Sequence, residues 1–252
     1  MTLLTDYGTA DSYVAEVKGA LLRRAPGAVL VDVTHEVAPG DLAGAAYVLG
    51  RAWSAFPEGT VHLAVVDPGV GTVRRGLAVG AGGHCFVAPD NGVLSGPLGL
   101  RGARAVSLPV PADASPTFHG RDVFAPAAAR LACGEPLEAL GAAMDDPERL
   151  PKPRLERVGP DLRGEIVYVD RFGTLVTNLP GRRVVEGTAV RLGAYDLVLR
   201  RTFADVPRGE PVAFVGSGGT VEIAVRDARA DAALGATRGG EVRARARARG
   251  AG

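Results

Sequence analysis

The sequence predicts an α/β N-terminal domain with a mostly parallel sheet, followed by a C-terminal all-β, barrel-like domain. Strand and helix patterns alternate through residues 1–150, which is typical of parallel βαβ units. From residue 165 to 252 only short strands occur, and turns rich in glycine separate several of them, as in a small barrel. Residues 151–164 are rich in proline and charge, so we expect them to form a linker.

The first domain opens with a strand, a helix and a second strand. The strand covers residues 1–4, the helix begins near Asp11 or Ser12, which are both good N-cap residues, and the second strand covers 28–33. Further elements are expected at 42–56 (a helix capped by Asp41), at 61–66, 76–80, 84–87 and 105–108 (strands), and at 123–133 (a helix that tolerates Pro126 in its first turn).

The second domain reads as a series of strands. They are expected at 165–169, 174–178, 189–192, 197–200, 211–215 and 221–225. Residues 242–249 alternate between apolar residues and arginine, which favours a final strand fraying into a tail over a basic binding arm.

Composition excludes several classes of protein. The net charge is +1 over 252 residues, which argues against nucleic acid or an anionic membrane as the main partner. The two cysteines, Cys85 and Cys133, have no metal-binding spacing and fit a reducing cytosol. No signal-like segment opens the chain, and no apolar run approaches the ~20 residues of a membrane helix. We therefore expect a soluble, cytoplasmic protein.

The stretch from Val61 to Arg75 is the first candidate site. Its apolar strand stops on Asp67, and ligands of open α/β sheets lie outside the carboxyl ends of the strands. Arg74 follows across a short turn, where a guanidinium would lower the pKa of the carboxylate and orient it. A structural ion pair fits equally well. Residues 69–71 are not a phosphate loop, because a strand rather than a helix follows them.

Asp6 and His119 are the other candidates that the pattern singles out. Asp6 ends the first strand, where it could accept the two hydroxyls of a ribose or simply cap a turn. His119 lies in a loop that leads into a helix, which favours a proton-handling role, whereas His35 and His62 accompany apolar strands. Loop clusters that could meet a ligand, but more often form β-turns, occur at 90–92, 170–173 and 217–219.

Taken together, these motifs resemble the S-adenosylmethionine (SAM) hydroxide adenosyltransferase family, which is related to the fluorinase and chlorinase enzymes. The resemblance extends over nearly the whole chain. Its motifs are Thr5–Gly8, Val29–His35, Phe56–Thr60, Val65–Thr72, Ala88–Gly92, Phe118–Asp122, Asp170–Gly173, Thr177–Asn178 and Gly216–Ser217. The resemblance implies an α/β domain, a β-barrel domain and a homotrimer, with the ligand between the N-domain of one subunit and the C-domain of its neighbour.

The activity implied by the resemblance is attack of water or hydroxide on C5′ of SAM, which releases adenosine and L-methionine. No cofactor or metal is implied, because SAM is the substrate. The sulfonium makes methionine a good neutral leaving group, but water has a pKa near ~15.7 and must be oriented and activated. By resemblance the family's Asp-Arg-His set falls on Asp67, Arg74 and His119. We expect Asp67 and His119 to position the water and Arg74 to lower the pKa of the bound hydroxide.

The resemblance also implies how the substrate is bound. Asp6 becomes the acceptor of the ribose hydroxyls, and Phe172 would stack near the adenine. Asp11 and Asp170 become candidates for binding the methionine ammonium, and Ser217 becomes the candidate for binding the methionine carboxylate. Halogenating relatives carry tyrosine at the position of Asp67, where a carboxylate would repel a halide anion.

The chain departs from the family pattern at two positions. Thr174 stands where the family commonly has asparagine, so an amide contact to adenine is absent or moved to Asn178. Gly218 stands where the halogenases have an arginine, so the resemblance does not carry that contact to the methionine carboxylate over to this chain.

Two other functions fit parts of the pattern. A divalent-metal-dependent phosphohydrolase could build an oxygen-rich site from Asp6, Asp67, Asp90 and His119. A non-catalytic nucleoside or SAM-binding sensor would retain the site for binding alone.

Overall fold

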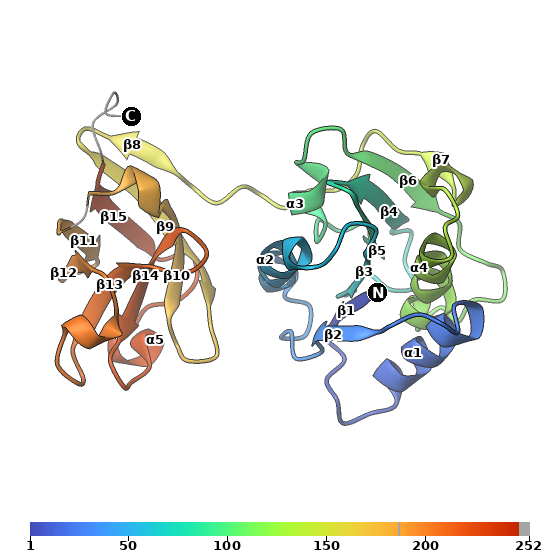
Figure 1. Cartoon of the computed structure of the whole chain (residues 1–252), viewed down its shortest axis with the longest axis horizontal. Coiled ribbons are helices and arrows are strands. Elements are labelled where there is room, and N and C mark those ends of the chain that lie inside the picture. Colours follow the sequence, from blue (N-terminus) through green and yellow to red (C-terminus); the bar gives the residue numbers. More distant parts are fainter. Residues whose placement is uncertain (186, 247–252) are drawn as a thin grey trace. The chain divides into compact units, whose positions relative to one another are not determined.

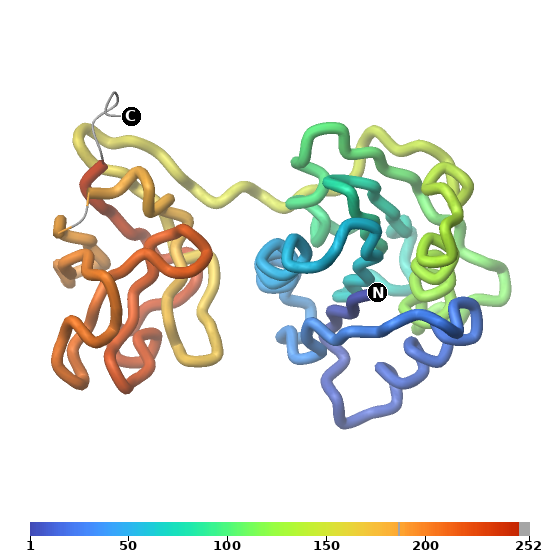
Figure 2. The backbone as a smooth tube through the Cα atoms, in the orientation of Figure 1, coloured from blue at the N-terminus to red at the C-terminus, as the bar shows by residue number. Residues whose placement is uncertain are grey.

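The computed structural model describes residues 1–185 and 187–246 (Figure 1). The chain divides into two compact units, Met1–Leu150 and Pro151–Gly252. Each unit has its own hydrophobic core, and the backbone completes the first unit before it enters the second (Figure 2). Among the described residues, no helix is long and apolar enough to cross a membrane.

A seven-stranded sheet forms the centre of the first unit, in the order β2-β1-β3-β5-β4-β6-β7. Its parallel neighbours are β2 (Val31–Thr34), β1 (Thr2–Thr5), β3 (Val61–Val65) and β5 (His84–Pro89). The antiparallel neighbours are β4 (Gly76–Ala81), β6 (Arg104–Leu108) and β7 (Ala142–Ala143). The expected α/β domain with parallel strands is therefore confirmed. The sheet turns antiparallel at β4 because the Gly82-Gly83 connection, with φ of 59° and 81°, is too short for a crossover.

Helices cover both faces of this sheet. On one face, α1 (Tyr13–Arg24) and α4 (Ala125–Ala132) share a core with Leu3 and Val65. On the other face, α2 (Leu42–Ala52) shares a core with Leu4 and Ala64, and α3 (Ser95–Leu98) packs there too. The two cores use alternate residues of the same strands, because successive side chains of a strand point to opposite faces.

The helix boundaries follow local signals. The Asp41 side chain caps α2 by accepting a hydrogen bond of 3.0 Å from the Gly44 amide, as expected. The chain then tightens into a 3₁₀ turn before residue 56, and a π-helical turn precedes α4 where one continuous α-helix was expected. The short helical turns are Trp53–Ala55, Gly120–Phe124, Leu137–Ala139, Gly181–Arg183 and Phe203–Asp205.

The second unit is a closed barrel of seven strands, which confirms the barrel-like prediction. Its strands are β9 (Asp161–Val169), β10 (Leu175–Pro180), β11 (Ala189–Leu192), β12 (Tyr195–Arg200), β13 (Pro211–Val215), β14 (Thr220–Val225) and β15 (Glu241–Arg245). They follow the order β10-β14-β13-β12-β11-β15-β9, and the pairing of β9 with β10 closes the ring. The short helix α5 (Ala230–Ala233) packs beside β14.

Part of the stretch expected to be a linker is strand. β8 (Glu156–Val158) pairs with the first residues of β9 through a turn at Gly159, whose φ is 58°. This hairpin is local, but its first strand is fully exposed and has no apolar pattern, so the sequence did not reveal it. The final strand ends at Arg245, and the rest of the expected strand beyond residue 246 lies outside the described residues.

Candidate active site

A buried ion pair joins Asp67, just beyond β3, to Arg74. The Arg74 Nε donates to Asp67 Oδ1 at 3.0 Å, and Nη2 donates to Oδ2, so the contact is bidentate. The side chains are only 6% and 8% exposed for Asp67 and Arg74. Gly71 lets the intervening turn fold back, since its φ is 77° and a Cβ there would lie 2.6 Å from the Pro116 carbonyl oxygen.

His119 completes a chain of three groups. Its Nδ1 lies 3.0 Å from Arg74 Nη2, and the residue is 5% exposed. A guanidinium can only donate, so Nδ1 must be the acceptor and the neutral ring carries its proton on Nε2. Burial, followed by the Arg74 cation, lowers the pKa of His119, which favours this neutral form. His119 is therefore a donor through Nε2–H.

Asp67 has the opposite electrostatic environment. Burial raises the pKa of its carboxyl above the ordinary value, although Arg74 opposes the shift. Arg74 is itself held by the Phe124 ring, whose centroid lies 5.2 Å from the guanidinium carbon. Asp67 is thus an ionisable group whose proton affinity exceeds that of an exposed aspartate.

Asp67 and His119 open onto a cavity of about 450 Å³, which Asp6 also lines. Asp6 is half-buried, and its Oδ2 accepts a hydrogen bond of 2.9 Å from the Gly40 amide. Arg74 does not line the cavity but connects Asp67 to His119. The structure therefore brings together the four residues that the sequence assigned to the ribose and to the water.

An aromatic wall forms another side of this cavity. Phe118 meets Tyr7 and Tyr13 edge-on, with ring centroids 5.9 Å and 5.4 Å away. The guanidinium of Arg121 lies 4.8 Å from the Phe118 centroid and is anchored by Glu16. No sequence pattern singled out Tyr7, although it directly follows Asp6, the carboxylate at the end of the first strand.

Asp11 is not part of this cavity. The residue is exposed, lies just before the N-cap Ser12 of α1, and is absent from the cavity lining. Its assignment to the methionine ammonium stays a prediction.

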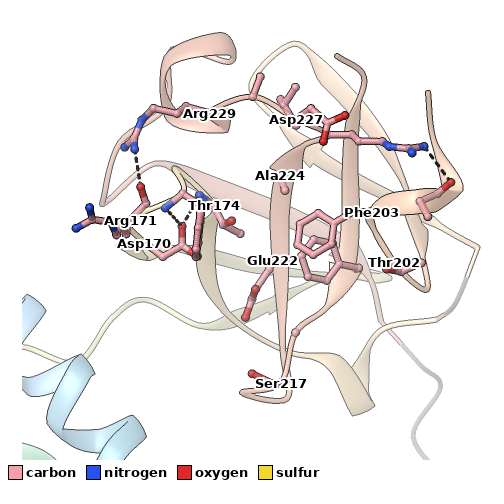
Figure 3. A pocket seen from close by; sticks show the side chains of 17 residues that line it. Asp170, Arg171, Thr174, Thr202, Phe203, Ser217, Glu222, Ala224, Asp227 and Arg229 are labelled. Atoms are coloured by element: carbon pink, nitrogen blue, oxygen red, sulfur yellow. Dashed lines mark hydrogen bonds between the residues drawn. The ribbon is translucent and has the colours of Figure 1, made fainter. Parts of the chain in front are cut away.

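The barrel carries a second pocket, of about 1080 Å³, which Asp170, Phe172 and Ser217 line (Figure 3). Asp170 Oδ1 accepts hydrogen bonds from the backbone amides of Phe172 and Thr174, at 2.9 Å and 2.8 Å. This Asx turn presents the Phe172 side chain, which is 78% exposed. Phe203 forms part of the pocket wall, its ring 4.5 Å from that of Phe214.

Asn178 lies outside this pocket. Its Oδ1 accepts from the Glu165 amide at 2.8 Å, and its Nδ2 donates to the Arg154 carbonyl at 2.7 Å. The amide therefore fastens the chain before the barrel to β9. Spacing could not reveal this role, because both partners are backbone groups remote in sequence.

The residues of the alternative metal site are engaged separately. Asp90 accepts from Arg75 Nε at 2.9 Å and from the Glu148 amide at 2.8 Å, while Asp67 accepts from Arg74. Within residues 1–185 and 187–246, no group of three or more His, Cys, Asp or Glu side chains could hold a metal ion.

Comparison with known proteins gives a consistent assignment. Models of the N-terminal and C-terminal domains of SAM hydroxide adenosyltransferases match residues 1–141 and 164–243. The chain is 46% identical to a protein of Thermus thermophilus named (R)-S-adenosyl-L-methionine hydrolase, covering 95% of this chain and 97% of that protein. It is 34% identical to a fluorinase of Actinoplanes, covering 89% of this chain and 90% of the fluorinase.

Solved structures share the fold of this chain. The crystal structure of an uncharacterized conserved protein from Thermotoga maritima superposes with a TM-score of 0.88 at 35% identity, covering 96% of this chain and 98% of the other. A conserved hypothetical protein from Thermus thermophilus gives a TM-score of 0.82 at 43% identity, with 98% of each chain covered. The chain belongs to the SAM hydroxide adenosyltransferase family.

Proposed function

We propose that this protein hydrolyses SAM at C5′ to adenosine and L-methionine. The observation that carries the proposal is the buried chain Asp67–Arg74–His119, two members of which face a cavity that also holds Asp6. Relatives that are 42–46% identical over at least 95% of this chain are named (R)-S-adenosyl-L-methionine hydrolases, which supports the same chemistry here.

Asp67 is the proton acceptor of this proposal. Arg74 has no acceptor, and His119 uses Nδ1 to accept from Arg74, so of the three only the Asp67 carboxylate keeps a free lone pair for the proton of water. Its raised pKa makes it a stronger base than an exposed aspartate. His119 Nε2–H would donate to the water oxygen and fix a lone pair toward C5′.

The reaction then needs no acid on the leaving side. The water oxygen forms a bond to C5′ as the C5′–S bond breaks, and the electron pair of that bond stays on sulfur. Sulfur passes from a sulfonium to the neutral thioether of methionine, and the proton of the water passes to Asp67. Arg74 keeps Asp67 oriented, and its positive charge favours the hydroxide that develops.

Substrate binding is divided between the two units in this proposal. Asp6 would accept the ribose hydroxyls, with its second oxygen held by the Gly40 amide. The barrel pocket would take the adenine against Phe172, and Asp170 and Ser217 would take the methionine. Asp11 would assist at the ammonium group. Asn178 is less suited to the adenine, because its amide already bonds to the backbone.

We also propose a homotrimer whose substrate lies between the first unit of one subunit and the barrel of its neighbour. The support is the family resemblance and the division of the assigned residues between two pockets. Light scattering tests the assembly. At low SAM concentration, rescue of activity on mixing an inactive Asp67 variant with a Phe172 variant of raised KM tests the shared site. A cytoplasmic location is proposed from the sequence, whose two cysteines fit a reducing compartment.

Incubation of the purified protein with SAM, with products followed by mass spectrometry, tests the function. The names of the relatives specify an (R) form in addition to the L-amino acid, which points to the sulfonium centre, so both sulfonium epimers are assayed. Adenosine and methionine should appear in equal amounts and be unaffected by EDTA. Tight binding with intact SAM would favour the sensor, and loss of phosphate ester hydrolysis in EDTA would favour the phosphohydrolase.

A further inference from the structure

The Tyr7 hydroxyl occupies a place that the fold keeps open for it. A Cβ atom at position 120 would lie 2.2 Å from the Tyr7 hydroxyl oxygen and 3.3 Å from Cζ. Gly120 does not adopt a positive φ, so glycine is required there for space rather than for backbone conformation. Gly120 directly follows His119, and Tyr7, His119 and Gly120 all line the cavity, so the hydroxyl lies against the residue next to the one proposed to hold the water.

The ring of Tyr7 is fixed on several sides. The backbone amide of Tyr7 donates to Thr5 Oγ1 at 3.3 Å, and the ring packs against Phe118 and Tyr13. A tyrosine with two χ angles and these contacts has little rotational freedom. The position of its hydroxyl is therefore defined by packing before any ligand enters.

The phenol is a donor that remains protonated. Burial raises the pKa of Tyr7, and the carboxylates of Asp6 and Asp67 raise it further, against a smaller opposing effect of Arg74. Asp6, Tyr7 and Asp67 all line the same cavity. Within the described part of the chain, no residue forms a hydrogen bond with the hydroxyl.

We infer that the Tyr7 hydroxyl donates a hydrogen bond to the attacking water, as a second donor beside His119 Nε2–H. The inference rests on the proposed function. Asp67 accepts the proton of the water, and as that O–H bond breaks the oxygen gains a third lone pair. Two lone pairs then accept from Tyr7 and His119, and the third forms the bond to C5′. The Tyr7 proton is not transferred: the water proton goes to Asp67, and the phenol stabilises the negative charge that develops on the oxygen.

The substitution Tyr7→Phe removes only this donor. The ring contacts with Phe118 and Tyr13 are kept, so the fold and SAM binding should persist. We expect kcat for adenosine release to fall about 10- to 100-fold, whereas KM changes less than about twofold. Tyr195→Phe is the matched control. Tyr195 lies on β12 of the barrel, so removing its hydroxyl should leave kcat unchanged.

A double-mutant cycle with Gly120→Ala separates the role of the hydroxyl from general packing. In the wild type the new methyl group must displace the Tyr7 hydroxyl, so Gly120→Ala should itself reduce kcat. In the Tyr7→Phe background the hydroxyl oxygen is gone. The atoms nearest to the Cβ at position 120 are then Cζ of residue 7, at 3.3 Å, and Val65 Cγ1, at 3.5 Å. The methyl group should therefore cost at least about fivefold less kcat there than in the wild type.

The outcomes distinguish the two proposals. A wild type that turns over SAM beside a Tyr7→Phe variant of equal kcat would overturn the Tyr7 assignment alone. A lower kcat with an equally large rise in KM, or with additive effects in the cycle, would also overturn it in favour of a packing role. A wild type that releases no adenosine from either epimer of SAM would overturn the proposed function and this inference with it.

Discussion

The cavity of the first unit and the pocket of the barrel use their charged side chains in different ways. At the cavity, Asp67 and His119 both bond to Arg74 behind them, and the three side chains are almost fully buried. In the barrel pocket, Asp170 bonds to the backbone of its own turn, and the turn displays the exposed Phe172. The contacts at the cavity set the proton affinities of Asp67 and His119, whereas the contacts of Asp170 set the shape of the pocket surface. We expect changes in the first to alter kcat and changes in the second to alter KM.

The largest effect that would test this contrast is that of Asp67→Asn. The amide keeps the size of the side chain but cannot accept the proton of water, so we expect kcat to fall by at least about 1000-fold. SAM binding, measured by calorimetry, should change less than about threefold.

Asp90→Asn provides a matched control for this substitution. Asp90 is also buried and also pairs with an arginine, Arg75, but it lies outside the cavity. Its variant should lose stability and keep kcat within about threefold of the wild type. Equal losses of kcat in the two variants would show that a buried ion pair matters only for folding.

Most helices and strands could be predicted from the sequence, because their signals lie within each segment or at its ends. Apolar runs bounded by glycine and proline predicted β3 and the barrel strands, and Asp41 predicted the start of α2. Two elements had no signal of their own in the sequence. β8 has no apolar pattern of its own and exists because β9 offers a free edge, and the π-helical turn after His119 depends on packing.

The residues of the candidate site also differ in how far the sequence could predict them. Asp67 and Arg74 are seven residues apart, so their pairing could be proposed from spacing. His119 lies 45 residues beyond Arg74, and only the family resemblance joined them. Tyr7 was missed because its role depends on the space above Gly120, which no pattern in one sequence encodes.

A second test compares how the stability of the first unit and of the barrel depends on pH. All four histidines lie in the first unit, and all are buried. His62 Nδ1 bonds to Thr2 Oγ1 at 2.7 Å, and its Nε2 lies 3.1 Å from His84 Nδ1. Burial, helped by His84, lowers the pKa of His62 to about 4. The unfolded chain, with an ordinary pKa near 6.5, therefore binds more protons, and stability is lost as pH falls below 6.5.

We expect the first unit to lose about 2 kcal/mol of unfolding free energy between pH 7.5 and pH 5. The lowered pKa of His119 acts in the same direction. Trp53, the single tryptophan, has its ring 5.0 Å from that of His84, so its fluorescence reports urea unfolding of this unit. His62→Gln should flatten the pH dependence. Protection factors for hydrogen exchange in the barrel strands, which are corrected for the pH dependence of the intrinsic exchange rate, should change little over this range. An equal loss of stability there would contradict the contrast.

The smallest expected effect is that of substitutions at Asp170, which can separate the structural role of this side chain from the role of its charge. Asp170→Asn keeps an Oδ1 that accepts from the Phe172 and Thr174 amides, whereas Asp170→Ala leaves both amides without this partner. The alanine variant should therefore lower the unfolding free energy of the barrel by about 1–2 kcal/mol, and the asparagine variant by much less. Denaturation followed by circular dichroism measures the difference.

Steady-state kinetics of the asparagine variant then show what the charge does. If the carboxylate faces the methionine ammonium, Asp170→Asn should raise KM for SAM about three- to tenfold and leave kcat within about twofold, since the proton-accepting groups lie in the other unit. An unchanged KM would limit Asp170 to holding its turn. A fall in kcat comparable to that of Asp67→Asn would instead mean that the barrel residue takes part in the chemical step, and the division between the two regions would be wrong.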